Sequence, residues 1–377
     1  MTSRLEDLIA ELCPNGVECK KIGDIATLSR GKVMSKSFIK DNSGEYPVYS
    51  SQTENNGQFG AISTYMYDGK YVTWTTDGAN AGTVFYRDGK FNVTNVCGVI
   101  DISDCQVDTK YVYYALTIHA KNYVSSGMGN AKLMSNVMSK VTIPVPPLEV
   151  QAEIVRILDT FTELTAELTA ELTARKKQYE YYRDTLLTFN DNNPLHSLIQ
   201  RYCPNGVEYK TLKEILTIKN GRDYKHLQEG KYPVYGSGGI MTHVSEYTYA
   251  EQSVLIPRKG SINKIYYVDE PFWNVDTIFY TIIRKNIVIP KYVYFCLLKE
   301  RLERYNTAGG VPSLTQSVLN DVTIPIPPLE VQRQIVQILD RFDALCNDLT
   351  QGLPAEIEAR RKQYEYYRDQ LLTFKRA

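Results

Sequence analysis

The sequence lacks an excess of charge of either sign. Lysine and arginine together number 43, and so do aspartate and glutamate, so the formal net charge at pH 7 is zero. A protein that grips nucleic acid through its own surface needs local positive charge to attract phosphates. The balance argues against a stand-alone binder of this kind. It leaves open a DNA reader whose partners supply much of the backbone contact.

Long apolar runs and paired cysteines are also missing. No apolar run approaches the length of a membrane-spanning helix, about 18 residues, and the first residues do not have the pattern of a signal peptide. The seven cysteines are scattered, without a Cys-x-x-Cys pair. We therefore expect no membrane association and a reduced, cytoplasmic setting.

Catalytic signatures are absent as well. There is no Gly-x-x-x-x-Gly-Lys-[Ser/Thr] phosphate loop and no Gly-x-Gly-x-x-Gly after a strand. The four histidines have no metal-ligand spacing. An adenine methyltransferase would need an Asn/Asp-Pro-Pro-Tyr/Phe motif, and Asn193-Pro194-Leu195 is not one. We expect no metal site, no cofactor bound by this chain and no catalysis; an independent nuclease or methyltransferase is the least favoured interpretation.

What the sequence does contain is a near repetition of itself. Three segments return: Thr142–Phe161 as Thr323–Phe342, Ala174–Phe189 as Ala359–Phe374, and Leu12–Lys20 as Tyr202–Lys210. The period is about 185 residues, far longer than the roughly 20 to 50 residues of a solenoid unit. The segments between these repeats are much less alike. The chain is therefore predicted to be a duplicated domain pair with approximate two-fold symmetry, in which matching frames carry different inserts.

A long helix is predicted at the end of each copy. The prolines of Ile143–Pro147 end a strand and favour a helix start, and apolar residues then follow at spacings of three and four as far as Phe189. About forty residues of helix span roughly 60 Å. The second copy repeats the pattern from Leu329, with a break predicted at Gly352–Pro354. Two such seams would pair most simply as an antiparallel two-helix coiled coil. The alternative, that each helix packs only on its own domain, is disfavoured by this length.

Each insert is predicted to be an α+β domain with a curved, mostly antiparallel sheet. Strands are expected at 46–49, 71–74, 83–86 and 96–100, and at 232–235, 253–256, 264–267 and 277–280. Turns are expected at Asp68-Gly69, Asp77-Gly78 and Asp88-Gly89. A short helix closes each insert, at Thr109–His119 and at Pro290–Glu300. The expected division is a first insert domain at 1–145, a long helix at 146–190, a second insert domain at 191–326 and a long helix at 327–377.

One asymmetry separates the two long helices. Phe161 and Gln178 are 17 residues apart, whereas Phe342 and Gln363 are 21 apart. The first stretch contains the tandem tetrapeptides Thr165-Ala-Glu-Leu168 and Thr169-Ala-Glu-Leu172. One such unit adds about one helical turn, roughly 6 Å. We interpret the unit as a length adjuster; the alternative is ordinary helix-forming sequence.

These features together resemble the DNA-specificity subunit of type I restriction-modification systems. The Ile-Pro-x-Pro-Pro-Leu-Glu-x-Gln stretch followed by a long helix occurs twice, and the likeness covers the whole chain. The tetrapeptides and the segment Ala174–Phe189 resemble the subfamily whose alleles differ in the number of Thr-Ala-Glu-Leu copies. The resemblance implies two target-recognition domains, each of which reads one half of a split, asymmetric sequence in double-stranded DNA. The antiparallel helix pair would set the unread gap between the halves.

The resemblance also implies partners. Two modification subunits would bind this scaffold and carry S-adenosylmethionine-dependent adenine methylation, and motor-nuclease subunits would complete the restriction complex. The alternative function is a coiled-coil adaptor or orphan specificity protein, which binds protein partners without selective DNA recognition.

The candidate DNA-contacting residues follow from side-chain chemistry and loop position, because the family offers no fixed base-contact code. Base reading needs amide, hydroxyl and guanidinium groups on loops that reach the groove edges. In the first domain the candidates are Arg30, Lys32, Ser50, Ser51, Gln52, Thr75, Thr76, Asn80, Asn130 and Lys132, the last two in a Gly-Met-Gly loop. In the second they are Asn220, Arg222, Tyr224, Lys225, Ser237, Arg258, Lys259, Asn263, Ser313 and Gln316. For any single residue, a solvated loop or a turn cap is an equally good interpretation.

Overall fold

The computed structural model of the protein describes residues 3–125, 130–306, 309–348 and 350–377. The chain divides into two units, which we call unit 1 (Met1–Leu168 with Ile357–Ala377) and unit 2 (Thr169–Glu356). The divisions fall inside two helices, α6 (Leu148–Leu186) and α12 (Leu353–Leu371). Each unit therefore combines one insert with parts of both long helices.

Unit 1 is built on a six-stranded sheet in the order β2-β7-β5-β6-β3-β4. Its strands are β2 (Ala26–Arg30), β3 (Ser43–Tyr49), β4 (Gln58–Ile62), β5 (Tyr67–Thr75), β6 (Val84–Val93) and β7 (Cys97–Ile102). Neighbours are antiparallel except β3 and β6, which are parallel. A separate antiparallel pair joins β1 (Cys19–Lys21) to β8 (Thr142–Pro144). The helical segments are α1 (Ser3–Leu12), α2 (Ile22–Ile25), α3 (Lys36–Asp41), η1 (Glu54–Gly57), α4 (Thr109–His119), η2 (Ala120–Tyr123) and α5 (Ser135–Met138).

In unit 2 two sheets take the place of the six-stranded sheet of unit 1. One has the order β10-β16-β13-β14 and the other β12-β11-β15. The strands of these sheets are β10 (Leu216–Lys219), β11 (Glu229–Gly236), β12 (Gly239–Val244), β13 (Ser253–Pro257), β14 (Tyr266–Val268), β15 (Trp273–Asn274) and β16 (Ile278–Ile283). A separate antiparallel pair joins β9 (Tyr209–Thr211) to β17 (Thr323–Pro325). The helical segments are α7 (His196–Tyr202), α8 (Leu212–Ile215), α9 (Pro290–Glu300), η3 (Leu302–Tyr305), α10 (Gln316–Asn320) and α11 (Leu329–Asn347). The sheet divides because β14 and β15 take the place of the single strand β6.

The strands and short helices expected from the sequence are present, but two of the three expected turns are not. Asp68 and Gly69 lie within β5, and Asp88 and Gly89 lie opposite them in β6, with Gly69 paired to Gly89. Both glycines have positive φ, +134° and +98°. Glycine here lets the two strands distort and continue, instead of ending them in a turn. The β5–β6 connection lies at Asp77-Gly78, the third expected position.

The repeated Pro-Pro-Leu-Glu-Val-Gln motif is explained by its glutamine. The side chain of Gln151 is fully buried; its Nε2 donates to the carbonyl of Pro146 at 2.7 Å, and its Oε1 accepts from the N–H of Asp108 at 2.8 Å. Gln332 makes the equivalent bonds to Pro327 and Ile289, at 2.7 and 2.9 Å. One buried amide therefore ties the start of the long helix to the start of α4 or α9 in each unit, which satisfies polar groups that would be costly to bury alone.

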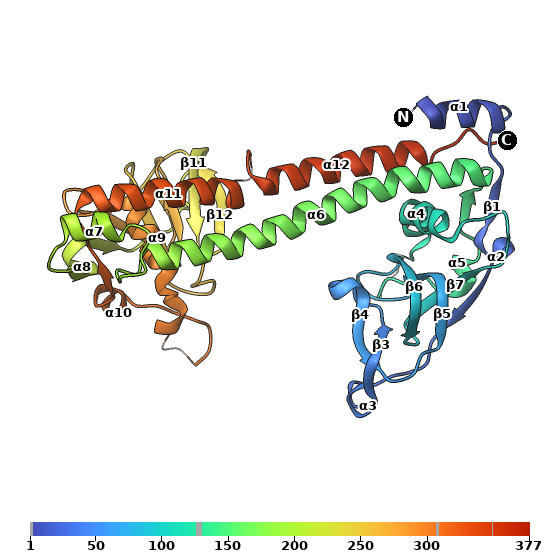
Figure 1. The fold of residues 1–377 in the computed structure, drawn as a ribbon, viewed down its shortest axis with the longest axis horizontal. Helices are drawn as coiled ribbons and strands as arrows, with labels where there is room; N and C mark the ends of the chain where they lie inside the picture. The colour runs from blue at the N-terminus through green and yellow to red at the C-terminus, as the bar shows by residue number, and fades with distance from the viewer. Residues whose placement is uncertain (1–2, 126–129, 307–308, 349) are drawn as a thin grey trace. The chain divides into compact units, whose positions relative to one another are not determined.

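The long helices have the predicted pattern. Within unit 1 the first part of α6 and the last part of α12 run antiparallel (Figure 1), and Phe161 packs on Tyr367. In the second copy α11 ends at Asn347 and α12 begins at Leu353, which confirms the break expected at Gly352. A Cβ on Gly352 would lie 2.6 Å from the carbonyl oxygen of Ala344, so this position requires glycine. The four extra residues of the second copy fall in the stretch that contains this break.

The last residues of the chain pair with its first loop. The N–H of Val17 donates to the carbonyl of Lys375 at 2.9 Å, and the N–H of Ala377 donates to the carbonyl of Val17 at 3.2 Å. The core of unit 1 accordingly contains Leu5 and Val17 from the start of the chain and Leu371 from near its end. The loop after α1 and the last residues of the chain therefore lie side by side in this unit (Figure 1).

Candidate nucleic-acid interface

In unit 1, hydrogen bonds join several loops that carry the DNA-contacting residues predicted from the sequence. We call them loop cluster 1, comprising residues 30–32, 50–57, 75–80 and 130–132. A bridge pairs Lys32 with Thr94, and the hydroxyl of Thr94 donates to that of Ser50 at 3.0 Å. The side-chain amide of Asn80 donates to the hydroxyl of Thr53 at 3.2 Å. The structure thus brings the segment that begins at Ser50, with Ser51 and Gln52, together with Lys32 and Asn80.

The β5–β6 connection is paired with the segment that contains Lys132. A bridge joins Asp77 to Lys132, and the N–H of Gly78 donates to the carbonyl of Ala131 at 3.0 Å. Lys132 and Asn130 are both exposed at the surface. Residues 126–129, which include the Gly-Met-Gly loop singled out in the sequence, lie outside the described residues.

Thr75 and Thr76 differ from the other candidates because neither has an exposed surface. The hydroxyl of Thr76 accepts a hydrogen bond from the guanidinium of Arg30 at 3.0 Å. The hydroxyl of Thr75 donates to the carbonyl of Asn80. In this structure the two threonines hold the loops that present Arg30 and Asn80. Their own contact with DNA stays a prediction.

A close backbone approach occurs at the same place in both units. A Cβ on Gly31 would lie 1.8 Å from the carbonyl oxygen of Val93, and one on Gly221 would lie 2.0 Å from that of Val275. Only glycine fits such a contact. The candidate side chains on either side of each glycine, Arg30 with Lys32 and Asn220 with Arg222, are therefore presented from equivalent positions.

Unit 2 assembles a corresponding set, which we call loop cluster 2, comprising residues 220–225, 237, 258–260 and 313–316. A bridge pairs Lys259 with Ser313. Thr277 connects two further candidates, because its carbonyl accepts from the N–H of Arg258 at 2.8 Å and its hydroxyl accepts from the N–H of Ser237 at 3.3 Å. The side-chain amide of Gln316 donates to Asn220 Oδ1 at 3.3 Å.

The segment after Gly221 is held by an aromatic side chain. The guanidinium of Arg222 lies 5.3 Å from the ring centroid of Trp273, and Trp273 Nε1 donates to the carbonyl of Arg222 at 3.1 Å. Tyr224 packs against the same small core, whereas Lys225 is exposed. Asn263 faces elsewhere: it lines a pocket with Glu180 and Arg183 of α6.

Each loop cluster has more cationic than anionic side chains, although the net charge of the whole chain is zero. Loop cluster 2 contains four cationic side chains, from Arg222, Lys225, Arg258 and Lys259, and one carboxylate, from Asp223. Loop cluster 1 contains three cations and two carboxylates. Local positive charge of this kind is what contact with phosphates requires. Within the described residues no group of His, Cys, Asp or Glu side chains could hold a metal ion, and no helix there has the length and apolarity needed to span a bilayer.

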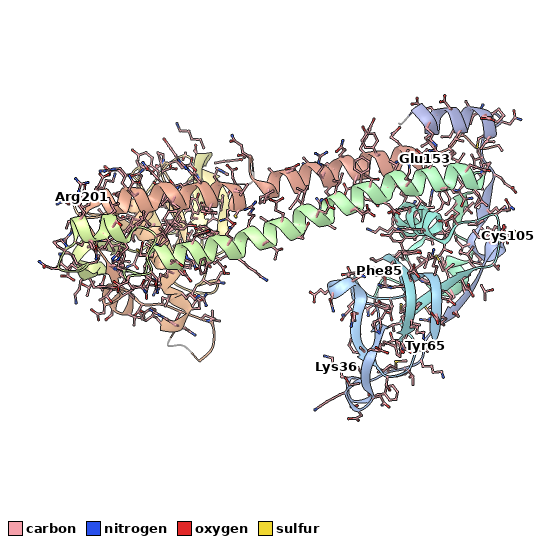
Figure 2. The ribbon with its side chains drawn as sticks, viewed as in Figure 1. Lys36, Tyr65, Phe85, Cys105, Glu153 and Arg201 are labelled. Atoms are coloured by element: carbon pink, nitrogen blue, oxygen red, sulfur yellow. The ribbon has the colours of Figure 1, made fainter. Side chains whose placement is uncertain are left out.

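Sequence reasoning missed two residues of loop cluster 1, Asn55 and Asn56, and one residue that packs against the cluster, Arg87. Arg87 is a buried arginine beneath the loop, and a lone arginine inside a strand gives no sequence signal. Asn55 and Asn56 precede Gly57, and this Asn-Gly step is a turn signal that could have drawn attention to them. Side chains across both units, Phe85 of β6 among those labelled, are drawn in Figure 2.

The sequence profile described as the type I restriction modification DNA specificity domain matches the chain twice, at residues 14–175 and 204–359. The chain belongs to this family. The two matches cover most of the sequence and coincide with the two copies of the repeat. A putative type I specificity subunit of Mycoplasma pneumoniae is 33% identical over 364 residues, which cover 93% of this chain and 96% of that one.

Two solved structures of type I restriction-modification systems have the same fold as this specificity-family chain. The S subunit of a type I system from M. genitalium superposes with a TM-score of 0.65 at 19% identity, over 95% of this chain and 96% of that one. A chain from a study of complex assembly and conformational transition of the type I system gives a TM-score of 0.52 at 15% identity, over 95% and 98%. The predicted α+β architecture, with two insert domains and long helices, is thereby confirmed.

Proposed function

We propose that the chain is the non-catalytic DNA-specificity subunit of a type I restriction-modification complex. Loop cluster 1 reads one half of an asymmetric, bipartite site in double-stranded DNA, and loop cluster 2 reads the other. The observation that carries the proposal is the equivalent presentation of unlike side chains. Gly31 and Gly221 make the same close backbone contact, yet Arg30 and Lys32 flank one and Asn220 and Arg222 flank the other. One frame with two sets of donors and acceptors suits two different half-sites.

The partners follow from the same proposal. Two modification subunits bind the scaffold and bind S-adenosylmethionine for adenine methylation, and motor-nuclease subunits complete the restriction complex. This chain binds no cofactor of its own. Partner subunits that contact the DNA backbone complement a chain whose net charge is zero.

The Thr-Ala-Glu-Leu units form the spacer in this proposal, as in the subfamily whose alleles differ in their number. The threonines of this stretch bond within α6: in the first unit Thr165 Oγ1 donates to the carbonyl of Phe161 at 2.8 Å, and directly after the second unit Thr173 Oγ1 donates to that of Thr169 at 2.9 Å. Each hydroxyl thus finds a partner one turn earlier in its own helix. A unit can be added or removed without leaving such a group unsatisfied, so the length of α6 can vary by about one turn, roughly 6 Å.

The test of the proposed function is a map of N6-methyladenine across the genome of cells that co-express the chain with its modification subunits. We expect a bipartite methylated motif. Replacing the insert at 26–133 with that of another specificity subunit should change one half-site and leave the other unchanged. Methylation that persists unchanged when the chain is deleted would contradict the proposal, and so would DNA binding indifferent to sequence.

A further inference from the structure

The connection between β3 and β4 is much longer in unit 1 than its counterpart in unit 2. Eight residues, 50–57, separate Tyr49 from Gln58. In unit 2 only Ser237 and Gly238 separate β11 from β12. The longer excursion is therefore a feature that unit 1 alone could use for recognition.

The end of this excursion has an unusual backbone. Asn55, Asn56 and Gly57 have φ of +49°, +53° and +78°, three successive residues in the left-handed region. That conformation is strained for residues with a side chain, and asparagine tolerates it better than most. Both asparagine side chains are exposed, and no described residue is hydrogen-bonded to either side-chain amide. The strained turn thus presents two adjacent amides to solvent, and strain of this kind is concentrated at functional sites.

Arg87 supports the turn from below. Only 3% of this side chain is exposed. Its Nη2 donates to the carbonyl of Asn56 at 2.9 Å and its Nε to the hydroxyl of Thr73 at 3.1 Å. The guanidinium carbon lies 3.5 Å from the centroid of the Tyr49 ring, at the point where the excursion begins. One planar group therefore connects the central strand β5 with both ends of the excursion.

This arrangement is costly, which argues that it has a purpose. No carboxylate among the described residues forms an ion pair with Arg87. The Nη1 atom of Arg87 is buried, and none of the described residues is its hydrogen-bond partner. Burial lowers the pKa of the guanidinium, because the charged form loses its hydration. A buried cation without a counter-ion destabilises a fold, so an apolar side chain would serve better if Arg87 only filled space.

We propose that Asn55 and Asn56 are base-reading residues for the first half-site, and that Arg87 is the positioning residue that aims them. An asparagine amide offers a donor beside an acceptor, the pattern that matches N6 and N7 of adenine in the major groove. Asn80 and Thr53 connect the turn to the other candidate residues of loop cluster 1. The inference rests on the proposed function of unit 1 and names a part of its recognition surface.

Substitution by glycine separates base reading from turn formation. Asn55→Gly and Asn56→Gly keep a residue that adopts positive φ without strain but remove the amide. We expect each variant, co-expressed with the modification subunits, to relax one base position of the first half-site. Methylation of sites that carry a non-cognate base at that position should rise about tenfold relative to methylation of cognate sites. The second half-site, read by unit 2 of the same molecule, is the internal control. Glycine variants with the wild-type motif and base preference would overturn the inference but leave the proposed function intact. A wild-type complex without a bipartite motif would overturn the proposed function, and this inference with it.

The role of Arg87 is tested through the asparagines. Arg87→Lys retains the charge but loses the planar fork, and we expect it to relax the same base positions. In a double-mutant cycle with Asn56→Gly, the double variant should relax the base position read by Asn56 no further than Asn56→Gly alone, because Arg87 acts on that position through the turn. Additive effects would show that Arg87 does not act through Asn56. An even loss of methylation at all sites, with base preference retained, would show a merely structural role.

Discussion

Phe161 stacks on Tyr367 in unit 1, with ring centroids 5.4 Å apart and ring planes 22° apart. In unit 2, Phe342 stacks on Tyr182 at 5.1 Å and 24°. Phe161 and Phe342 occupy the same repeat position, and so do Tyr182 and Tyr367. Each unit therefore takes its phenylalanine from one copy and its tyrosine from the other. The two copies of the repeat thus exchange one half of each aromatic pair.

The stacked tyrosines should matter more to stability than their neighbours. Tyr182→Ala and Tyr367→Ala are each expected to lower the free energy of unfolding by about 2 kcal/mol, since each removes a half-buried ring from an aromatic pair. The adjacent residues Tyr181 and Tyr366 are 67% and 63% exposed, so their alanine variants are matched controls that should stay within about 0.5 kcal/mol. Urea unfolding gives the comparison, and equal losses within each Tyr-Tyr pair would contradict it.

The contact between the two ends of the chain should make Gly16 more sensitive to substitution than its equivalent, Gly206. Gly16 and Gly206 are equivalent, with φ of +96° and +89°, but a Cβ on Gly16 would lie 2.6 Å from the carbonyl oxygen of Lys375, whereas one on Gly206 would meet nothing within 4 Å. Gly16→Ala and Gly206→Ala share a backbone cost of about 1 to 2 kcal/mol. Gly16→Ala should lose more, because the added methyl group displaces the end of the chain.

Deleting Lys375–Ala377 supplies the control for this pair. In the shortened chain the two glycine variants should have the same midpoint of unfolding, measured in urea. In the full chain trypsin should cleave after Lys375 faster in Gly16→Ala than in Gly206→Ala. A difference in stability that survives the deletion would show that Gly16 is constrained by something else.

A pH dependence is expected from His119. Burial lowers the pKa of this imidazole below its ordinary value of 6.5. The unfolded chain therefore binds the proton first as the pH falls, so stability is present above the unfolded pKa and declines as the pH drops below it. His119→Gln should have a smaller loss of unfolding free energy between about pH 7.5 and pH 5.5 than the wild type. Denaturant titrations at the two pH values give these free energies, and an equal loss in the variant and the wild type would refute this assignment.

Much of the frame could be predicted because local signals and packing agree in it. The proline-rich starts, the apolar seams and the glycine at the helix break predict α6, α11 and α12, and α4 and α9 have the predicted bounds. The Asp-Gly steps at Gly69 and Gly89 were wrongly predicted to be turns. They lie within β5 and β6, and only the pairing of these strands, with Gly69 opposite Gly89, shows this.

The two loop clusters were less predictable because they depend on contacts between distant residues. Candidates such as Lys32 and Ser50 could be chosen by chemistry, and the structure brings them together through Thr94. That Thr76 is buried under Arg30, and that Asn263 faces a different pocket, follows only from the tertiary structure. Arg87 is invisible to pattern reasoning because its partners lie on other strands and in a distant turn.

In the proposed function, two dissimilar readers are separated by an adjustable helical spacer. The spacer is tested by deleting Thr169–Leu172 and mapping N6-methyladenine in cells that co-express the modification subunits. We expect the same two half-sites with a shorter unread gap, because α6 loses one turn, roughly 6 Å, and rotates by about 40°. A changed half-site with an unchanged gap would contradict the spacer role.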